Sequence, residues 1–266
     1  MKLIVTSQKR FAGKNIYSLL VNEFGFKKTK DEFDGMLVCE KDEYKLICIS
    51  KEIIELEYLN DFFKPEIYLI GSTHKSESGM KSLTVHSPGN WAKADFGGKD
   101  RELSVCPALQ LRASLFEIMK HPKKDYAESF EVTHHGPSEM NAPIVYVEVG
   151  GSEKEWQDLD ACRIVCHGLL AKPAHCKVAV GFGGTHYAPN FSKLKVLENF
   201  ALGHICPKYH LDNIDEEMVL QAFEKTTPKP ELAVIDWKGC NKEQRDKLIA
   251  IFEKNKIPWK KIKDFS

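Results

Sequence analysis

The alternation of short apolar runs with helical patterns is the feature that most constrains the fold of this chain. Apolar runs of strand length recur from "KLIVTS" through "EIYLIGSTH" and "KVAVGFGG" to "ELAVIDW". Between them, apolar residues return every three or four positions, which is the period of a helix with one buried face. The alternation predicts an α/β fold with a mixed central sheet and helices on both faces.

Local signals predict several individual elements. "GMLVCE" and "YKLICIS" are expected to pair as a hairpin, and residues 13–24 are expected to form a helix. Pro107 suits the first position of a helix that is apolar on most sides and should therefore be central. Ser152 and Glu155 have the spacing of a helix-capping box.

Length and cysteine usage limit the class of protein. The 266 residues fit one α/β domain over residues 1–266, or two lobes with a weak boundary near residues 120–128, where polar residues cluster. The eight cysteines include no CxxC pair, which favours reduced thiols. No apolar run approaches the roughly 18 residues needed to span a bilayer. We therefore expect a cytoplasmic protein with no membrane partner.

The charge balance excludes a generally basic nucleic-acid binder. Lys+Arg and Asp+Glu are both 38, so the formal net charge is zero and DNA is not an expected partner. A zero net charge does not exclude a local basic face. Three lysine clusters occur, at residues 27–30, 120–124 and 260–263.

Histidines recur where predicted strands end. His74 follows "IYLIGST", the pair His134 and His135 follows "FEVT", His186 follows "VAVGFGGT" and His204 follows "FALG". In open α/β sheets, ligands bind outside the carboxyl ends of the strands. We therefore expect these histidine-bearing loops to meet over one crevice.

Two kinds of chemistry suit such a cluster. Imidazole is a zinc ligand, and it is also a general base with a pKa near neutrality. The spacings match no named zinc motif, so both remain open. The candidate metal ligands are His134, His186, His204 and Glu148, and the candidate catalytic residues are His74, His134, His135 and Glu77.

A glycine-rich loop gives a candidate substrate-binding segment. "GFGGTHYAP" carries Gly181, Gly183, Gly184 and Thr185, and its N–H groups are expected to hold an oxyanion or a phosphate. Cys162, Cys166 and His167 are not expected to bind metal, because both cysteines lie on the apolar stripe of a predicted helix.

The segment "VTHHGP" allows two geometries. If the strand continues through it, alternation places His134 on the face of Phe130 and Val132, with His135 on the opposite face. On that geometry we expect His134 to face the crevice. If the chain has already turned, which the following Gly-Pro favours, both rings face inward.

Four segments together resemble the archaeal and plant type of D-aminoacyl-tRNA deacylase. They are "STHKSESGMKSLTVHSPGNW", "VTHHGP", "GFGGTHYAP" and "GHICPKY", which occur in matching order between residues 72 and 209. The resemblance implies an α/β fold similar to phosphorylases and hydrolases. It also implies a zinc-dependent monomeric hydrolase that cleaves the ester between a D-amino acid and the terminal adenosine of tRNA.

On this interpretation the lysine clusters, with Lys123 and Lys124 foremost, are candidates for tRNA contacts. Two alternatives remain at this stage. One is a zinc-dependent peptidase or amidase of similar fold, which a requirement for tRNA would distinguish. The other is a non-catalytic tRNA-binding module, which the strand-end histidines disfavour because phosphate binding prefers Lys and Arg.

Overall fold

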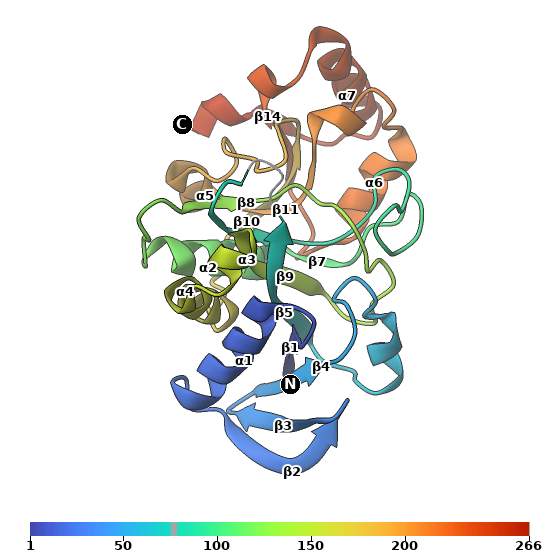
Figure 1. The fold of residues 1–266 in the computed structure, drawn as a ribbon. Coiled ribbons are helices and arrows are strands. Elements are labelled where there is room, and N and C mark those ends of the chain that lie inside the picture. The colour runs from blue at the N-terminus through green and yellow to red at the C-terminus, as the bar shows by residue number, and fades with distance from the viewer. Residues whose placement is uncertain (76–78, 266) are drawn as a thin grey trace.

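The larger of the two main sheets has eight strands in the order β2-β3-β4-β1-β5-β9-β6-β8 (Figure 1). The computed structural model describes residues 1–75 and 79–265. Strands β4, β1, β5 and β9 are mutually parallel, whereas β6 runs antiparallel to β9 and parallel to β8. The strands are β1 Lys2–Ser7, β2 Lys27–Phe33, β3 Met36–Lys41, β4 Tyr44–Ile49, β5 Ile67–Lys75, β6 Ser82–His86, β8 Ala127–Phe130 and β9 Ile144–Gly151.

Four helices cover one face of this sheet. They are α1 Phe11–Asn22, α2 Ala108–Met119, α3 Glu153–Trp156 and α4 Leu159–Leu169. Leu69 of β5 and Val147 of β9 pack with Ile16 of α1 and Leu169 of α4 in one buried cluster. Because side chains alternate along a strand, the next residues point to the opposite face. There Ile70 and Tyr146 belong to a separate cluster.

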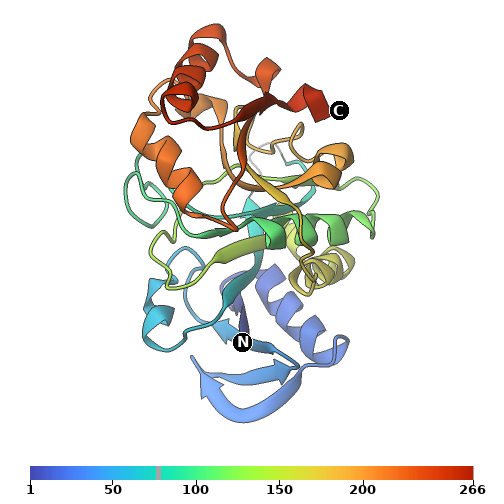
Figure 2. The same cartoon turned by 180° about the vertical axis from the view of Figure 1, so that it is seen from behind.

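The second main sheet is parallel throughout, in the order β11-β10-β13-β14. Its strands are β10 Lys177–Phe182, β11 Phe200–Cys206, β13 Leu232–Ile235 and β14 Trp259–Lys261. Helices α6 Glu216–Glu224 and α7 Lys242–Lys254 contribute Met218 and Phe252 to a cluster with Phe182. On the other face lie α2 and α5 Leu194–Asn199. The red C-terminal end of this part, with α7 and β14, stands above the first sheet in both views (Figure 1 and Figure 2).

Helix α2 connects the two sheets, because it packs against β6 and β8 of the first and β11 of the second. The expectation that this helix is central is therefore confirmed. The smaller elements are β7 Cys106–Pro107, which pairs with β12 Thr226–Thr227, and the short 3-10 helices η1 Glu57–Asp61, η2 Lys208–His210, η3 Trp237–Gly239 and η4 Ile262–Phe265. Residues 120–128 lie between α2 and β8, and the chain passes to the second sheet only after α4.

The local predictions are confirmed, with small shifts in the positions of the elements. β3 and β4 form the expected antiparallel hairpin, and the capping box of Ser152 and Glu155 is present. Pro107 precedes its helix instead of opening it. The mixed α/β class is confirmed, although among the described residues α1 to α4 lie on one face of the large sheet. Seven of the eight cysteines are buried, and no described helix is long and apolar enough to cross a membrane.

Candidate active site

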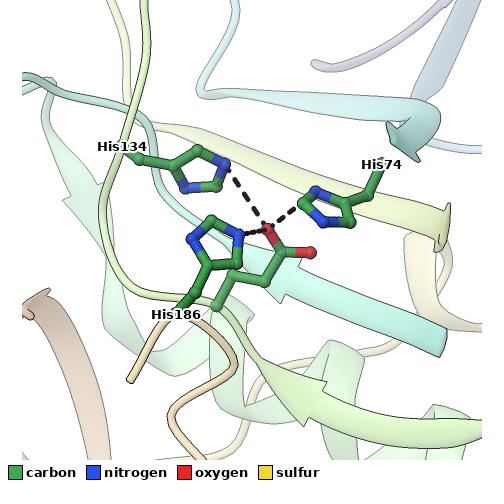
Figure 3. A group of neighbouring side chains, drawn as sticks. His74, His134 and His186 are labelled. Atoms are coloured by element: carbon green, nitrogen blue, oxygen red, sulfur yellow. Dashed lines mark hydrogen bonds and ion pairs between the residues drawn. The ribbon is translucent and has the colours of Figure 1, made fainter. Parts of the chain in front are cut away.

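One buried carboxylate, that of Glu131, forms the centre of the site. Three ring nitrogens point at its Oε2 atom: His186 Nε2 at 3.0 Å, His74 Nδ1 at 3.1 Å and His134 Nε2 at 3.4 Å (Figure 3). Oε1 of Glu131 is buried and has no hydrogen-bond partner among the described residues. The four residues each offer one donor atom, and these atoms lie within 4.8 Å of one another. We call them the Glu131 group.

The group forms where the two sheets meet. β8 ends at Phe130, and the N–H of Glu131 still bonds to the carbonyl of Val85 in β6. The N–H groups of Val132 and Thr133 then bond to the carbonyls of His186 and Ile205, which belong to the second-sheet part. The chain leaving β8 is thus held between the two sheets, and Glu131 is buried at that junction.

The strand does not continue through "VTHHGP", so of the two geometries that the sequence allowed, the one with an inward and an outward histidine is not the one present. Residues after Phe130 leave the strand, and His135 has a φ of 44°, in the left-handed region. Both His134 and His135 line the same cavity. This is the turned geometry, in which neither ring is directed to the opposite sheet face.

Hydrogen bonding fixes the proton on His134. Its Nδ1 lies 2.8 Å from the carbonyl oxygen of Val132 and donates to it, which leaves a lone pair on Nε2 of the neutral ring. Burial, reinforced by His86 and His135, lowers the pKa of His134 well below its ordinary value. The ring is therefore neutral at physiological pH.

The carboxylate that faces it is ionised. Burial opposes the charge of Glu131, but hydrogen bonds from His186 and His74 hold its pKa well below the ordinary value. Burial would lower the pKa of His74, yet the contact with Glu131 raises it overall. A lone pair of His134 thus faces a carboxylate oxygen, and a cation between the two atoms would stabilise the arrangement.

The ring of His134 packs on a row of stacked rings. His86 stacks on Tyr146 of β9 at 5.0 Å between ring centroids, and His134 stacks on His86 at 4.3 Å. Nε2 of His86 lies 3.2 Å from Oε2 of Glu148, which is buried. His86, His134 and His135 also offer three nitrogens within 4.8 Å, so His134 belongs to two sets of possible metal ligands.

A cavity of about 580 Å³ opens beside these residues. This volume is in the range of small-molecule sites. The lining residues are Arg10, Glu52, Ile53, Ile54, Thr73, His74, Lys75, Phe96, His134, His135, Glu148 and Trp156. Polar groups for chemistry and apolar walls for a side chain therefore meet in one space.

His204 does not join the site, which corrects its assignment as a metal ligand. Its Nδ1 lies 3.0 Å from the hydroxyl of Thr133, and its Nε2 lies 2.9 Å from the carbonyl oxygen of Ser104. Nε2–H donates to that carbonyl and Nδ1 accepts from the hydroxyl, so both nitrogens are occupied. Burial lowers the pKa of His204 to about 4, and the neutral ring connects β11 to the segments that carry Thr133 and Ser104.

The glycine-rich loop is used for packing. Gly183 donates its N–H to the carbonyl of Cys206, and a Cβ atom at this position would lie 2.5 Å from Sγ of Cys240. Within the described residues, Gly181, Gly183, Gly184 and Thr185 are not among those that line the cavity. Thr185 directly precedes His186 of the Glu131 group, so the loop lies next to the site, and its role in binding an oxyanion stays a prediction.

The other sequence candidates have different outcomes. Glu77 lies outside the described residues. Glu148 lines the cavity, contacts His86, and forms with His86 and Glu131 a further set of possible metal ligands. Lys123 forms ion pairs with Asp158 at 3.2 Å and Asp160 at 3.6 Å, while Lys124 is exposed.

Glu131 and His86 are the site residues that the sequence interpretation missed. His86 follows "SLTV" in the same way that the other histidines follow their strands, so the same signal applied to it. Glu131 lies inside "FEVTHH", where an acidic residue at a strand end has the pattern of an exposed position. Glu131 is buried only because the chain that follows it packs against the second-sheet part.

A mixed α/β chain that gathers three imidazoles and a carboxylate beside a cavity has the site of a hydrolytic enzyme. The family model for D-aminoacyl-tRNA deacylase matches residues 61–260. The D-aminoacyl-tRNA deacylase of Pyrococcus furiosus is 35% identical, over 92% of this chain and 94% of that protein. That of Methanocaldococcus jannaschii is 35% identical over 98% and 99%.

A crystal structure described as a conserved protein of unknown function superposes with a TM-score of 0.89 at 30% identity, covering 100% of this chain and 96% of the other. The chain therefore belongs to the D-aminoacyl-tRNA deacylase family. Its activity is ester hydrolysis on D-aminoacyl-tRNA, and the alternatives of an amidase and of a non-catalytic tRNA-binding module are set aside.

Proposed function

We propose that this chain deacylates D-aminoacyl-tRNA with a zinc ion held by the Glu131 group, namely His74, Glu131, His134 and His186. The observation that carries the proposal is the lone pair of His134 Nε2 directed at an ionised carboxylate oxygen 3.4 Å away. Neutral imidazoles and a carboxylate are the donor set that zinc prefers among biological cations. The Val132 carbonyl, which orients His134, is the kind of second partner that zinc-binding histidines have.

A bound zinc ion supplies Lewis acidity and lowers the pKa of a coordinated water. The chain must then position that water and the ester. In the reaction, the water oxygen bonds to the carbonyl carbon, the bond to the ribose oxygen breaks, and one water proton ends on that oxygen. An aminoacyl ester is already activated, so placement is the main requirement.

His135 is suited to orienting the water. Its Nδ1 lies 2.5 Å from the carbonyl oxygen of Gly136 and donates to it, which leaves Nε2 as an acceptor beside the cavity. Burial, with the neighbouring His86, lowers the pKa of His135 to about 4, so the ring stays neutral over the physiological range. We propose that it accepts a hydrogen bond from the attacking water.

Discrimination between enantiomers requires a wall on one side of the α-carbon. Ile53 and Ile54 line the cavity together with His134 and His135 and give it an apolar wall of this kind. We propose that the D side chain lies along this wall. D-tyrosine should be released from tRNA much faster than L-tyrosine, and equal rates would contradict this use of the wall.

Metal dependence is tested by chelation. Removing metal should abolish the release of D-tyrosine from D-tyrosyl-tRNA, and added zinc should restore it. Because the contact with Glu131 raises the pKa of His74, a proton competes with zinc for this ring from a higher pH, and zinc affinity should fall as the pH is lowered. Full activity of the metal-free protein would contradict the need for metal and would indicate that a histidine acts as the general base.

We also propose that the enzyme works as a cytoplasmic monomer. A single chain supplies all four residues of the Glu131 group, which is consistent with this proposal. Sedimentation at the enzyme concentration used for activity tests this directly. A dimer at that concentration would contradict it.

A further inference from the structure

Phe96 is an exposed aromatic ring in an unusual place. Its side chain is 70% accessible, and it lines the same cavity as His74, His134 and His135. Phe62 is exposed to a similar degree, 63%, but packs among aromatic neighbours and does not line the cavity. The fold therefore places one exposed phenylalanine ring in the lining of the cavity that contains the site histidines.

The segment that carries Phe96 is firmly held. The N–H of Gly136, which directly follows the histidine pair, donates to the carbonyl of Phe96 at 2.9 Å. The buried Asn90 amide donates to the carbonyls of Gly97 and Lys99, at 2.9 and 3.1 Å. The N–H of Lys99 donates to the hydroxyl of Ser138 at 2.9 Å.

These bonds, at Phe96 and at the residues that follow it, hold its backbone relative to the histidines. Gly97 and Gly98 have φ values of 79° and 76°, which only glycine adopts without strain, and they let the turn approach Gly136 closely. A rigid loop with an exposed ring is suited to binding a flat ligand, because little conformational entropy is lost on contact.

The substrate has a flat group close to its reacting ester. In an aminoacyl-tRNA the reacting ester is attached to the ribose of the last nucleotide, so its base lies only one sugar away from the carbonyl carbon. A base in the single-stranded end of an RNA has no pairing partner, and proteins bind such bases by stacking on aromatic side chains. Lys75 lines the same cavity and gives it a cation for an adjoining phosphate, together with Arg10, which is paired with Glu52 at 3.4 Å.

We propose that Phe96 is the stacking platform for the terminal adenine of the tRNA acceptor end. The assignment rests on the proposed function, since it places the ester over the Glu131 group. A D side chain is the competing occupant of this surface. The adenine is favoured because the ring lies open at the rim, whereas the apolar wall deeper in the cavity is formed by Ile53, which is buried.

The first test measures deacylation by Phe96→Ala. KM for D-tyrosyl-tRNA should rise roughly 10- to 100-fold, the usual loss for a stacked base, with kcat much less affected. Phe96→Trp should restore a low KM. Phe62→Ala is the matched control, because it removes an equally exposed phenylalanine away from the cavity, and its KM should stay within twofold.

The second test separates the base from the amino acid. On D-tyrosine ethyl ester, which lacks a nucleotide, the loss caused by Phe96→Ala should be at least tenfold smaller than on D-tyrosyl-tRNA. Equal losses on both substrates would overturn the proposal and assign Phe96 to the amino-acid side chain.

The third test does not depend on the reaction. Uncharged tRNA with 2-aminopurine as its last base should lose fluorescence when it binds the wild-type enzyme, and keep it with Phe96→Ala. Quenching by both proteins would overturn the proposal. Failure of the proposed chemistry would instead appear as normal quenching by an enzyme that hydrolyses no ester.

Discussion

The Glu131 group and the surroundings of His204 show how differently one fold can use histidines from similar sequence settings. In the Glu131 group, ring nitrogens from three histidines converge on one carboxylate oxygen, and Nε2 of His134 has no hydrogen to donate to it. At His204, each nitrogen meets a partner of the opposite kind, a hydroxyl and a carbonyl. The first arrangement is stabilised by adding a cation, whereas the second is already complete.

Position at a strand end therefore does not make a histidine reactive. The groups that its two ring nitrogens contact decide whether it is reactive. Burial lowers the pKa of His134 and of His204, so a shifted pKa does not separate them either. Only the geometry around the nitrogen lone pairs distinguishes His134 from His204. Mutations of these two residues should therefore have different effects.

The largest effect is expected for His134→Ala. This change removes a nitrogen from the two sets of possible metal ligands that contain His134. Loss of an imidazole that takes part in chemistry lowers the rate by roughly a hundredfold or more. Single-turnover release of D-tyrosine measures it, and an unchanged melting temperature shows that the variant is folded. A folded and fully active variant would remove His134 from the site.

His135→Ala should cost less. Its ring lines the cavity but makes no contact with Glu131 Oε2 among those that define the group. We expect a loss of roughly 10- to 100-fold in single-turnover rate, as for residues that orient a reacting group. The two losses remain unequal, although not for the reason that strand alternation suggested. A loss as large as that of His134→Ala would place His135 in the same role.

His204→Ala should act on stability. It leaves the buried carbonyl of Ser104 without its donor and the buried hydroxyl of Thr133 without the acceptor to which it donates, and it opens a cavity. We expect a decrease in the free energy of unfolding of about 2 to 4 kcal/mol. Denaturant unfolding measures it, with His175→Ala as the control, since His175 is exposed. A stable His204→Ala protein without activity would reverse the comparison.

The smallest effect is expected from reversing Lys123 and Lys124 to Glu. Lys123 is already paired with Asp158 and Asp160, so it has less charge to offer a phosphate. Binding of tRNA should weaken slightly, and the slope of log affinity against log salt should become shallower by about 0.7 to 0.9 for each phosphate that the variant no longer binds. An unchanged slope would show that this cluster takes no part in tRNA binding.

The sequence was sufficient for the fold class and for much of the site. The hairpin of β3 and β4, the central helix α2 and the capping box before α3 were predictable because each depends on local periodicity or spacing. His74, His134, His135 and His186 were predictable from their place after apolar runs. They meet as expected, although the reason differs from the one that predicted them.

That reason failed because strand direction is not visible in an apolar run. β6 runs antiparallel to β9, and β10 and β11 belong to another sheet, so the strand ends do not meet at one edge. The site forms at the junction of the sheets, where the turn at His135 brings both rings over β6 and β9. The burial of Glu131 depends on contacts between distant segments, which no local pattern reports.

The most direct test of this comparison is the zinc content of three proteins, measured by mass spectrometry after purification without added chelator. We expect bound zinc in the wild type and in His204→Ala, and no bound zinc in His134→Ala. Zinc that is absent from the wild type, or that remains in His134→Ala at the wild-type level, would contradict the claim that the Glu131 group is a metal site.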